Sequence, residues 1–171
     1  MRRISGKNLV LIGFMGTGKT EVGRLLADSL TRRMVDTDRL ISEREGMAIR
    51  EIFAARGEGY FRAVEKQVIA ELSAQKGLVL STGGGVILDA DNVATLCSSG
   101  FVVWLDANVE TLAQRLQGDR TRPLLAENDI AELYGKREEL YRQASHLRVD
   151  TAEKTPLTVA REILGLLQRD V

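Results

Sequence analysis

Short apolar runs alternate along the chain with longer segments in which apolar residues recur every three or four positions. The runs have the length of β-strands, and the longer segments have the period of amphipathic helices. The strand-like runs are residues 9–12, 34–35, 78–80, 101–105 and 147–149. This alternation predicts an α/β fold, a five-stranded parallel sheet with helices on both faces.

Helical periodicity follows most of the apolar runs. It begins at Lys19 with apolar residues at positions 22, 25, 26 and 30, and returns in residues 61–72, 93–96, 108–116 and after Pro156, a good first-turn residue. No repeat, low-complexity tract or linker interrupts the pattern, so we expect a single domain over residues 1–171. Residues 118–129 are polar and lack clear periodicity, which predicts a mobile loop.

Composition narrows the class of protein. The 171 residues are 44% hydrophobic and 28% charged, with 24 basic and 24 acidic side chains and a formal net charge of zero. A globular chain is therefore expected, and binding to nucleic acid or an anionic membrane by bulk electrostatics is not. No apolar run approaches the roughly 18 residues of a membrane span. With one cysteine and one histidine, neither an internal disulfide nor a Cys/His zinc site is possible, and we expect a cytoplasmic protein.

A glycine-rich segment connects the first predicted strand to the first predicted helix. It reads Gly13-Phe14-Met15-Gly16-Thr17-Gly18-Lys19-Thr20, a phosphate-binding (P-loop) pattern in the context that its mechanism requires. Backbone amides of such a loop cradle phosphate oxygens at the helix N-terminus. Lys19 would reach the β- and γ-phosphates, and the Thr20 hydroxyl would ligate Mg²⁺. The segment predicts that the chain binds a nucleoside triphosphate.

The rest of the chain favours a small kinase over other nucleotide-binding classes. The Asn-Lys-x-Asp loop with which GTPases read guanine is absent. Residues 101–106 have the shape of a motor-type strand ending in a catalytic carboxylate, but Asp106 could equally begin the next loop or cap its helix. A kinase for a small molecule fits best.

Two carboxylates and a glycine triplet follow predicted strands, at the sheet edge where ligands bind. Asp36 could hold the Mg²⁺ shell, and Asp38 could accept a hydrogen bond or proton from an attacking hydroxyl, although both could simply be helix caps. The triplet, residues 83–85, exposes backbone amides, but a plain turn is the alternative.

Several arginines are candidates for binding anions. Arg62 and Glu65 share a helix face, either as a surface ion pair or as a guanidinium held ready for a substrate carboxylate. Arg115, Arg120 and Arg122 fall within eight residues. Arg122 could act on the transferring phosphoryl group as a loop closes.

In order and spacing these motifs resemble the shikimate kinase family across nearly the whole chain. The matching segments are the phosphate loop, Asp36-Thr37-Asp38, Gly57-Glu58-x-x-Phe61-Arg62-x-x-Glu65, the triplet, Arg122-Pro123-Leu124-Leu125 and Arg137-x-x-Leu140-Tyr141. The resemblance implies a P-loop kinase fold with a substrate-binding helical region at about 36–65 and a mobile lid at about 115–128. It also implies transfer of the ATP γ-phosphoryl group to the 3-hydroxyl of shikimate with Mg²⁺ as cofactor. We expect a monomer.

The resemblance also implies roles for individual residues. Asp38, Lys19 and Arg122 would be catalytic, with Asp38 as base. Arg62 and Arg137 would pair with the substrate carboxylate, Glu65 would orient Arg62, and the triplet would contact substrate through the Gly84 amide. Thr20 would hold Mg²⁺ directly and Asp36 through water. The ATP-binding residues would be Gly13, Gly16, Thr17, Gly18, Lys19, Thr20, Arg115, Arg122 and Pro156, with Arg115 and Pro156 sandwiching adenine.

One departure from the family concerns the segment between Arg122 and Arg137. It has fourteen residues, about one helical turn fewer than is common in the family. The lid contacts and any role of Arg120 depend on this segment, and Arg142 is the alternative to Arg137 if the register shifts. Two other functions stay open: phosphorylation of another hydroxy acid such as gluconate, and a regulatory nucleotide-binding domain without catalysis.

Overall fold

The strands of the protein form one parallel sheet. The structure is a computed structural model in which residues 4–117 and 129–168 are described. The strand order is β2-β3-β1-β4-β5, with every neighbouring pair parallel. The strands are β1 (Asn8–Ile12), β2 (Arg33–Asp36), β3 (Leu78–Ser81), β4 (Gly100–Asp106) and β5 (Leu147–Asp150). The five predicted runs all lie in these strands, so the predicted sheet is confirmed.

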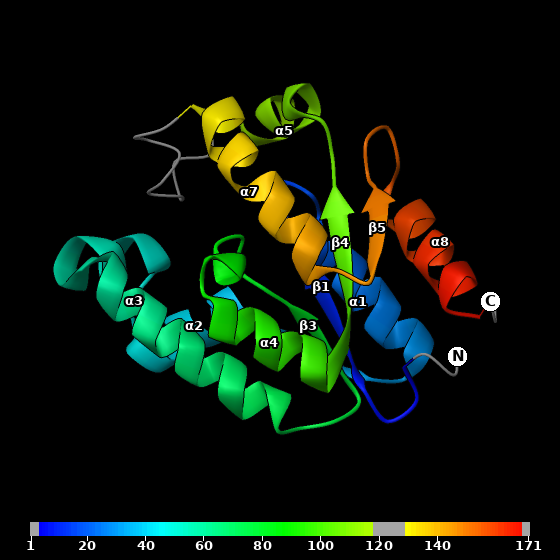
Figure 1. Cartoon of the computed structure of the whole chain (residues 1–171), viewed down its shortest axis with the longest axis horizontal. Coiled ribbons are helices and arrows are strands. Elements are labelled where there is room, and N and C mark those ends of the chain that lie inside the picture. Colours follow the sequence, from blue (N-terminus) through cyan, green and yellow to red (C-terminus); the bar gives the residue numbers. More distant parts are fainter. Residues whose placement is uncertain (1–3, 118–128, 169–171) are drawn as a thin grey trace.

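Helices cover both faces of the sheet (Figure 1). The helices α1 and α8 pack on one face, and α3, α4 and α7 pack on the other. The helical elements are α1 (Lys19–Leu30), α2 (Thr37–Glu45), α3 (Ile49–Ser73), the 3₁₀ turn η2 (Val86–Leu88), α4 (Ala90–Ser99), α5 (Val109–Leu116), α7 (Ile130–Ala144) and α8 (Pro156–Gln168). None of the helices in the described ranges is long and apolar enough to cross a membrane.

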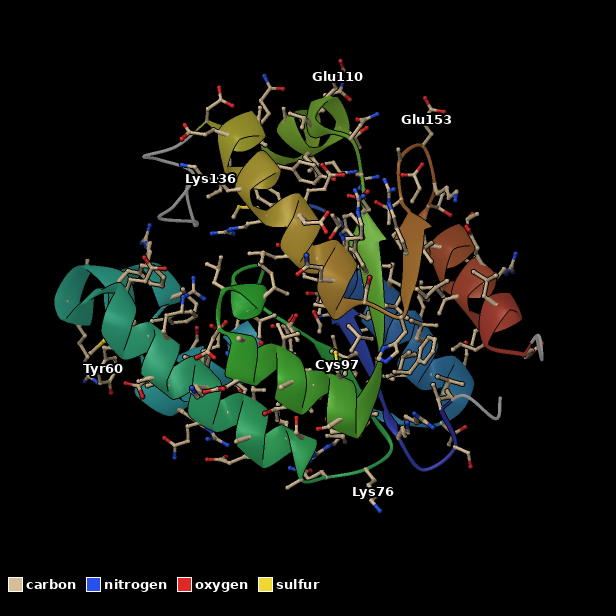
Figure 2. All side chains as sticks on the ribbon, viewed as in Figure 1. Tyr60, Lys76, Cys97, Glu110, Lys136 and Glu153 are labelled. Carbon is tan, nitrogen blue, oxygen red and sulfur yellow. The ribbon has the colours of Figure 1, made fainter. Side chains whose placement is uncertain are left out.

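The two-sided covering explains why the central strands are continuously apolar. Successive strand residues point to opposite faces. In β1, Leu9 and Leu11 pack into the core on the α1 and α8 side, whereas Val10 and Ile12 pack into the core on the α3, α4 and α7 side. Charged side chains such as Lys76, Glu110 and Glu153 point away from the ribbon (Figure 2). Both faces are therefore used for packing, and ligands must bind at a sheet edge.

The helix α3 extends further toward its N-terminus than periodicity predicts, and it is bent. Gly57 has φ 80° and ψ 167° inside α3, a conformation that side-chain-bearing residues rarely adopt. The bend brings Phe53 from the first part of the helix against Phe61 from the second, with ring centroids 4.9 Å apart. Both parts of α3 can therefore line the same cavity.

Asp106, the last residue of β4, is buried and serves the fold. Its carboxylate accepts a hydrogen bond from the Tyr134 hydroxyl at 2.8 Å and pairs with Arg148 at 2.6 Å. Asn108 caps α5 instead, since its side chain accepts from the backbone N–H of Thr111. Of the alternatives left open for Asp106, the helix cap is therefore wrong. The carboxylate ties α7 and β5 to the end of β4.

Replacing Asp106 with alanine should lower the free energy of unfolding by about 2–4 kcal/mol. The change removes a buried charge and leaves the largely buried Tyr134 hydroxyl without its acceptor. Arg148→Ala is the control and should cost about 1 kcal/mol, because that side chain is 56% exposed. Urea denaturation measures both values, and equal losses in the two variants would contradict this account.

Candidate active site

A cavity of about 350 Å³ lies over the loop between β1 and α1. The loop has positive φ at Gly13, Gly16 and Gly18, and a Cβ at Gly13 would collide with the backbone carbonyl of Leu105. The Thr17 hydroxyl donates to the carbonyl of Phe14 at 2.8 Å. The Lys19 ammonium donates to the carbonyls of Gly13 and Phe14 at 2.8 and 2.9 Å. The predicted phosphate loop is thus formed, with a positive charge held against it.

Oxygen ligands suited to Mg²⁺ stand beside the loop in the same cavity. The Thr20 hydroxyl donates to Oδ2 of Asp36 at 2.6 Å, and the Ser81 hydroxyl donates to the same oxygen at 3.2 Å. Asp36 also caps α2, since its Oδ1 accepts from the N–H of Arg39. No group of three or more His, Cys, Asp or Glu residues suited to a metal occurs in the described part of the chain. One hydroxyl and one carboxylate fit an ion that keeps several waters and binds mainly through phosphates.

Of the two residues expected to sandwich adenine, Arg115 lines the first cavity and Pro156 does not. This first cavity is the expected nucleotide cavity, and the guanidinium of Arg115 donates to the carbonyls of Gly16 and Thr151 at 3.2 and 2.7 Å. Pro156 begins α8 and is not among the lining residues of this cavity or of the next. A contact of Pro156 with adenine stays a prediction.

A second cavity, of about 470 Å³, adjoins the first. Every substrate-binding residue expected from the sequence lines it. Its lining residues are Met15, Asp38, Ser42, Ala48, Ile49, Arg50, Phe53, Phe61, Arg62, Glu65, Gly83, Gly84, Gly85 and Arg137. Asp38 and Gly84 line both cavities, so these two residues mark the place where groups bound in the two cavities can meet.

Asp38 is placed by the start of α2. The preceding residue, Thr37, is fully buried, and its hydroxyl accepts a hydrogen bond from the N–H of Gly83 at 3.1 Å. This bond fixes the first turn of α2 against the glycine triplet. A Cβ on Gly83 would lie only 2.5 Å from Oδ1 of Asp38. The carboxylate thus occupies space that only a glycine leaves open.

Arg62 is held by a buried carboxylate. Its Nη1 pairs with Oε2 of Glu65 at 2.7 Å, and its Nη2 pairs with Oε1 of Glu58 at 3.0 Å. Glu65 is only 1% exposed, so this is no surface ion pair. Burial raises the pKa of the Glu65 carboxyl, while the Arg62 guanidinium pulls that pKa down. A Cβ on Gly85 would overlap the guanidinium of Arg62, which therefore also depends on the glycine triplet.

Arg137 reaches the second cavity from α7. It is 3% exposed, and its guanidinium lies over the ring of Phe14 at 5.9 Å from the centroid. Arg142 instead pairs with Glu138 at 2.9 Å on an exposed part of the helix and lines neither cavity. The register therefore places Arg137, not Arg142, in the cavity. Arg120 and Arg122, with most of the expected lid at 115–128, lie outside the described residues.

Sequence reasoning missed several cavity residues on α2 and α3. Ser42, Ile49, Arg50 and Phe53 line the second cavity. Ile49, Arg50 and Phe53 reach it because α3 bends at Gly57, whereas Ser42 lies on α2, one helical turn after Asp38. A glycine inside an otherwise helical pattern was the available signal.

Together these features define a class of protein. A phosphate loop, oxygen ligands for a hard cation, and an adjoining cavity with two arginines and an aspartate at the junction are the parts of a P-loop kinase for a small acidic acceptor.

Comparisons with known proteins name the particular family. The family model described as shikimate kinase matches residues 15–168. A shikimate kinase of Persephonella marina is 44% identical over 164 residues, covering 95% of this chain and 99% of the relative. A solved shikimate kinase of Acinetobacter baumannii in complex with shikimate is 39% identical, with a TM-score of 0.92, and the match covers 97% of this chain and 95% of that one. The chain belongs to the shikimate kinase family.

A more distant likeness bears on the alternative acceptor. A gluconokinase of Sinorhizobium meliloti matches with a TM-score of 0.59 but only 18% identity, covering 98% of this chain and all of that one. Such a match shows a shared fold alone. It gives no specific support for gluconate as the substrate of this chain.

Proposed function

We propose that the chain transfers the γ-phosphoryl group of ATP to the 3-hydroxyl of shikimate, forming shikimate 3-phosphate and ADP. The carrying observation is the second cavity, where Arg62 and Arg137 enter from different helices and Asp38 stands at the junction with the nucleotide cavity. Shikimate is a carboxylate that carries ring hydroxyls. Two guanidinium groups, a carboxylate acceptor and the backbone amide of Gly84 are its chemical complement.

The proposed reaction uses positioning and charge stabilisation. The 3-hydroxyl oxygen forms a bond to the γ-phosphorus, the bond from that phosphorus to the bridging oxygen of ADP breaks, and Asp38 accepts the hydroxyl proton. Lys19 stabilises charge on the phosphoryl group. We propose the same for Arg122, which lies beyond the described ranges.

Thr20 and Asp36 are the residues that would hold Mg²⁺, directly and through water respectively. When bound, the ion would neutralise charge on the β- and γ-phosphates. The support is the donor set itself, because the Thr20 hydroxyl and the Asp36 carboxylate already meet at 2.6 Å beside the phosphate loop.

We further propose that the enzyme is a single-domain monomer that works in the cytoplasm. The strands of the described ranges form a single sheet, which supports one domain. The single cysteine, Cys97, fits a reducing setting, and its thiol donates to the carbonyl of Ala144 at 3.4 Å. Sedimentation of the purified protein measures the oligomeric state.

Identification of the product tests the proposed function. Incubation with ATP, Mg²⁺ and shikimate should give a phosphomonoester whose phosphorus couples to the proton on C3 in ³¹P NMR. A phosphate on a different hydroxyl would contradict the regiochemistry. ATP binding without any phosphoester would favour a regulatory nucleotide-binding domain instead.

Gly85→Ala should raise the KM for shikimate about tenfold, because the new methyl group displaces the guanidinium of Arg62 from a substrate contact. Gly59→Ala on α3 is the matched control: a Cβ there meets nothing within 4 Å, and it should leave this KM unchanged. Steady-state kinetics at saturating ATP measures both. A KM for Gly85→Ala within twofold of wild type would show that Arg62 is not displaced from a substrate contact.

A further inference from the structure

Tyr141 of α7 is a fully buried side chain that joins two parts of the second cavity. Its hydroxyl donates to the carbonyl of Gly84 at 2.5 Å. Arg137 lies one helical turn earlier on α7, and its guanidinium acts on the same phenol, pulling its pKa down against the larger effect of burial. Its ring stacks on Trp104 with centroids 5.9 Å apart, so the core fixes the position of the phenol.

The bond to Gly84 sets the orientation of a peptide in the glycine triplet. The peptide group is planar and trans, so holding the Gly84 carbonyl toward Tyr141 directs the N–H of Gly85 the opposite way. The neighbouring peptide is fixed separately, since the carbonyl of Gly83 accepts from the N–H of Val86 at 3.2 Å. Because Gly84 has no Cβ, its backbone has fewer steric constraints than that of other residues, and the bond from Tyr141 restricts it.

The phenol can hold both partners at once because it stays neutral. Burial raises the pKa of Tyr141 well above its usual range, so the oxygen keeps its proton for Gly84 and still offers a lone pair to Arg137. One atom thereby links a guanidinium and a backbone segment that both line the cavity.

We propose that Tyr141 is a positioning residue that keeps Arg137 and, through the Gly84 carbonyl, the glycine triplet at the spacing that the acceptor substrate requires. This inference rests on the proposed function, in which Arg137 binds the carboxylate and the glycine triplet binds a ring hydroxyl. The substrate must then contact Arg137 with its carboxylate and the glycine triplet with a ring hydroxyl at the same time. Tyr141 is not among the described residues that line either cavity, so in this proposal it acts through Arg137 and Gly84.

The test is Tyr141→Phe, which removes one oxygen and keeps the ring on Trp104. Tyr134→Phe is the matched control on the same helix: it also loses a buried hydroxyl bond, to Asp106, but Tyr134 lines neither cavity. Tyr141→Phe should raise the KM for shikimate about tenfold, as expected when a charge-assisted hydrogen bond is misaligned. The KM for ATP should stay within twofold, and kcat should change much less than the KM for shikimate.

The control separates positioning from general loss of stability. Tyr134→Phe should lower the melting temperature without moving the KM for shikimate. Equal shifts of that KM in both variants, an equal rise in the KM for ATP, or a KM within twofold of wild type in Tyr141→Phe would overturn the inference alone. Absence of shikimate-dependent ADP release from the wild-type protein would overturn the proposed function and this inference with it.

Discussion

Replacing Asp38 with asparagine should lower kcat about 100- to 10,000-fold, the contribution typical of a positioned general base. Asparagine has nearly the same shape, so the contact with the glycine triplet survives, but an amide cannot take the proton of the attacking hydroxyl. The effect should be confined to turnover, because the phosphate loop and Lys19 are unchanged.

The measurement pairs a coupled ADP assay with calorimetric titration of ATP. Asp91→Asn is the control, since Asp91 is exposed on α4, pairs with Lys66 and lines neither cavity. That variant should keep wild-type kcat. If Asp38→Asn retained more than about a tenth of wild-type kcat, against the range for a general base, Asp38 would not be the base.

Arg137→Ala should weaken shikimate binding by about 2–4 kcal/mol, which corresponds to about 30- to 900-fold in the dissociation constant. A carboxylate bound by a buried guanidinium loses both its counter-charge and its hydrogen bonds when the arginine is removed. No salt bridge joins Arg137 to a carboxylate within the described residues, so its removal leaves no buried acid unpaired.

This makes Arg137 a cleaner test than Arg62. Arg62→Ala would leave Glu65 buried without its counter-ion, and lost stability would then mix with lost binding. Arg142→Ala is the matched control on α7, because Arg142 is exposed and paired with Glu138. Calorimetry with shikimate should show a large loss for Arg137→Ala and none for Arg142→Ala. Equal affinity in both variants would remove Arg137 from the carboxylate site.

The sequence was most informative where local pattern and fold coincide. Leu9 to Ile12 are apolar because both faces of β1 are covered, and such a continuous apolar run can be recognised from the sequence alone. The phosphate loop is a contiguous motif whose chemistry depends on its own backbone. Asp38 could be placed because parallel strands end at a common edge. The alternative that Asp38 is only a helix cap could be rejected only once the structure showed that it lines both cavities.

Other parts could not be predicted because they depend on contacts distant in sequence. From the sequence, Asp106 could be either a catalytic carboxylate at a strand end or a loop or cap residue, and its partners Tyr134 and Arg148 are 28 and 42 residues away. Arg50 lines the second cavity only because α3 bends at Gly57. The hydroxyl of Tyr141 meets Gly84 across 57 residues, so no local pattern indicates that bond.

The most direct test of the account is acceptor-dependent release of ADP by the wild-type protein with ATP and Mg²⁺. The two arginines and Asp38 predict that ADP release requires shikimate and that gluconate at the same concentration gives only the background rate. Equal ADP release with gluconate, or a rate with shikimate no higher than with ATP alone, would contradict the account.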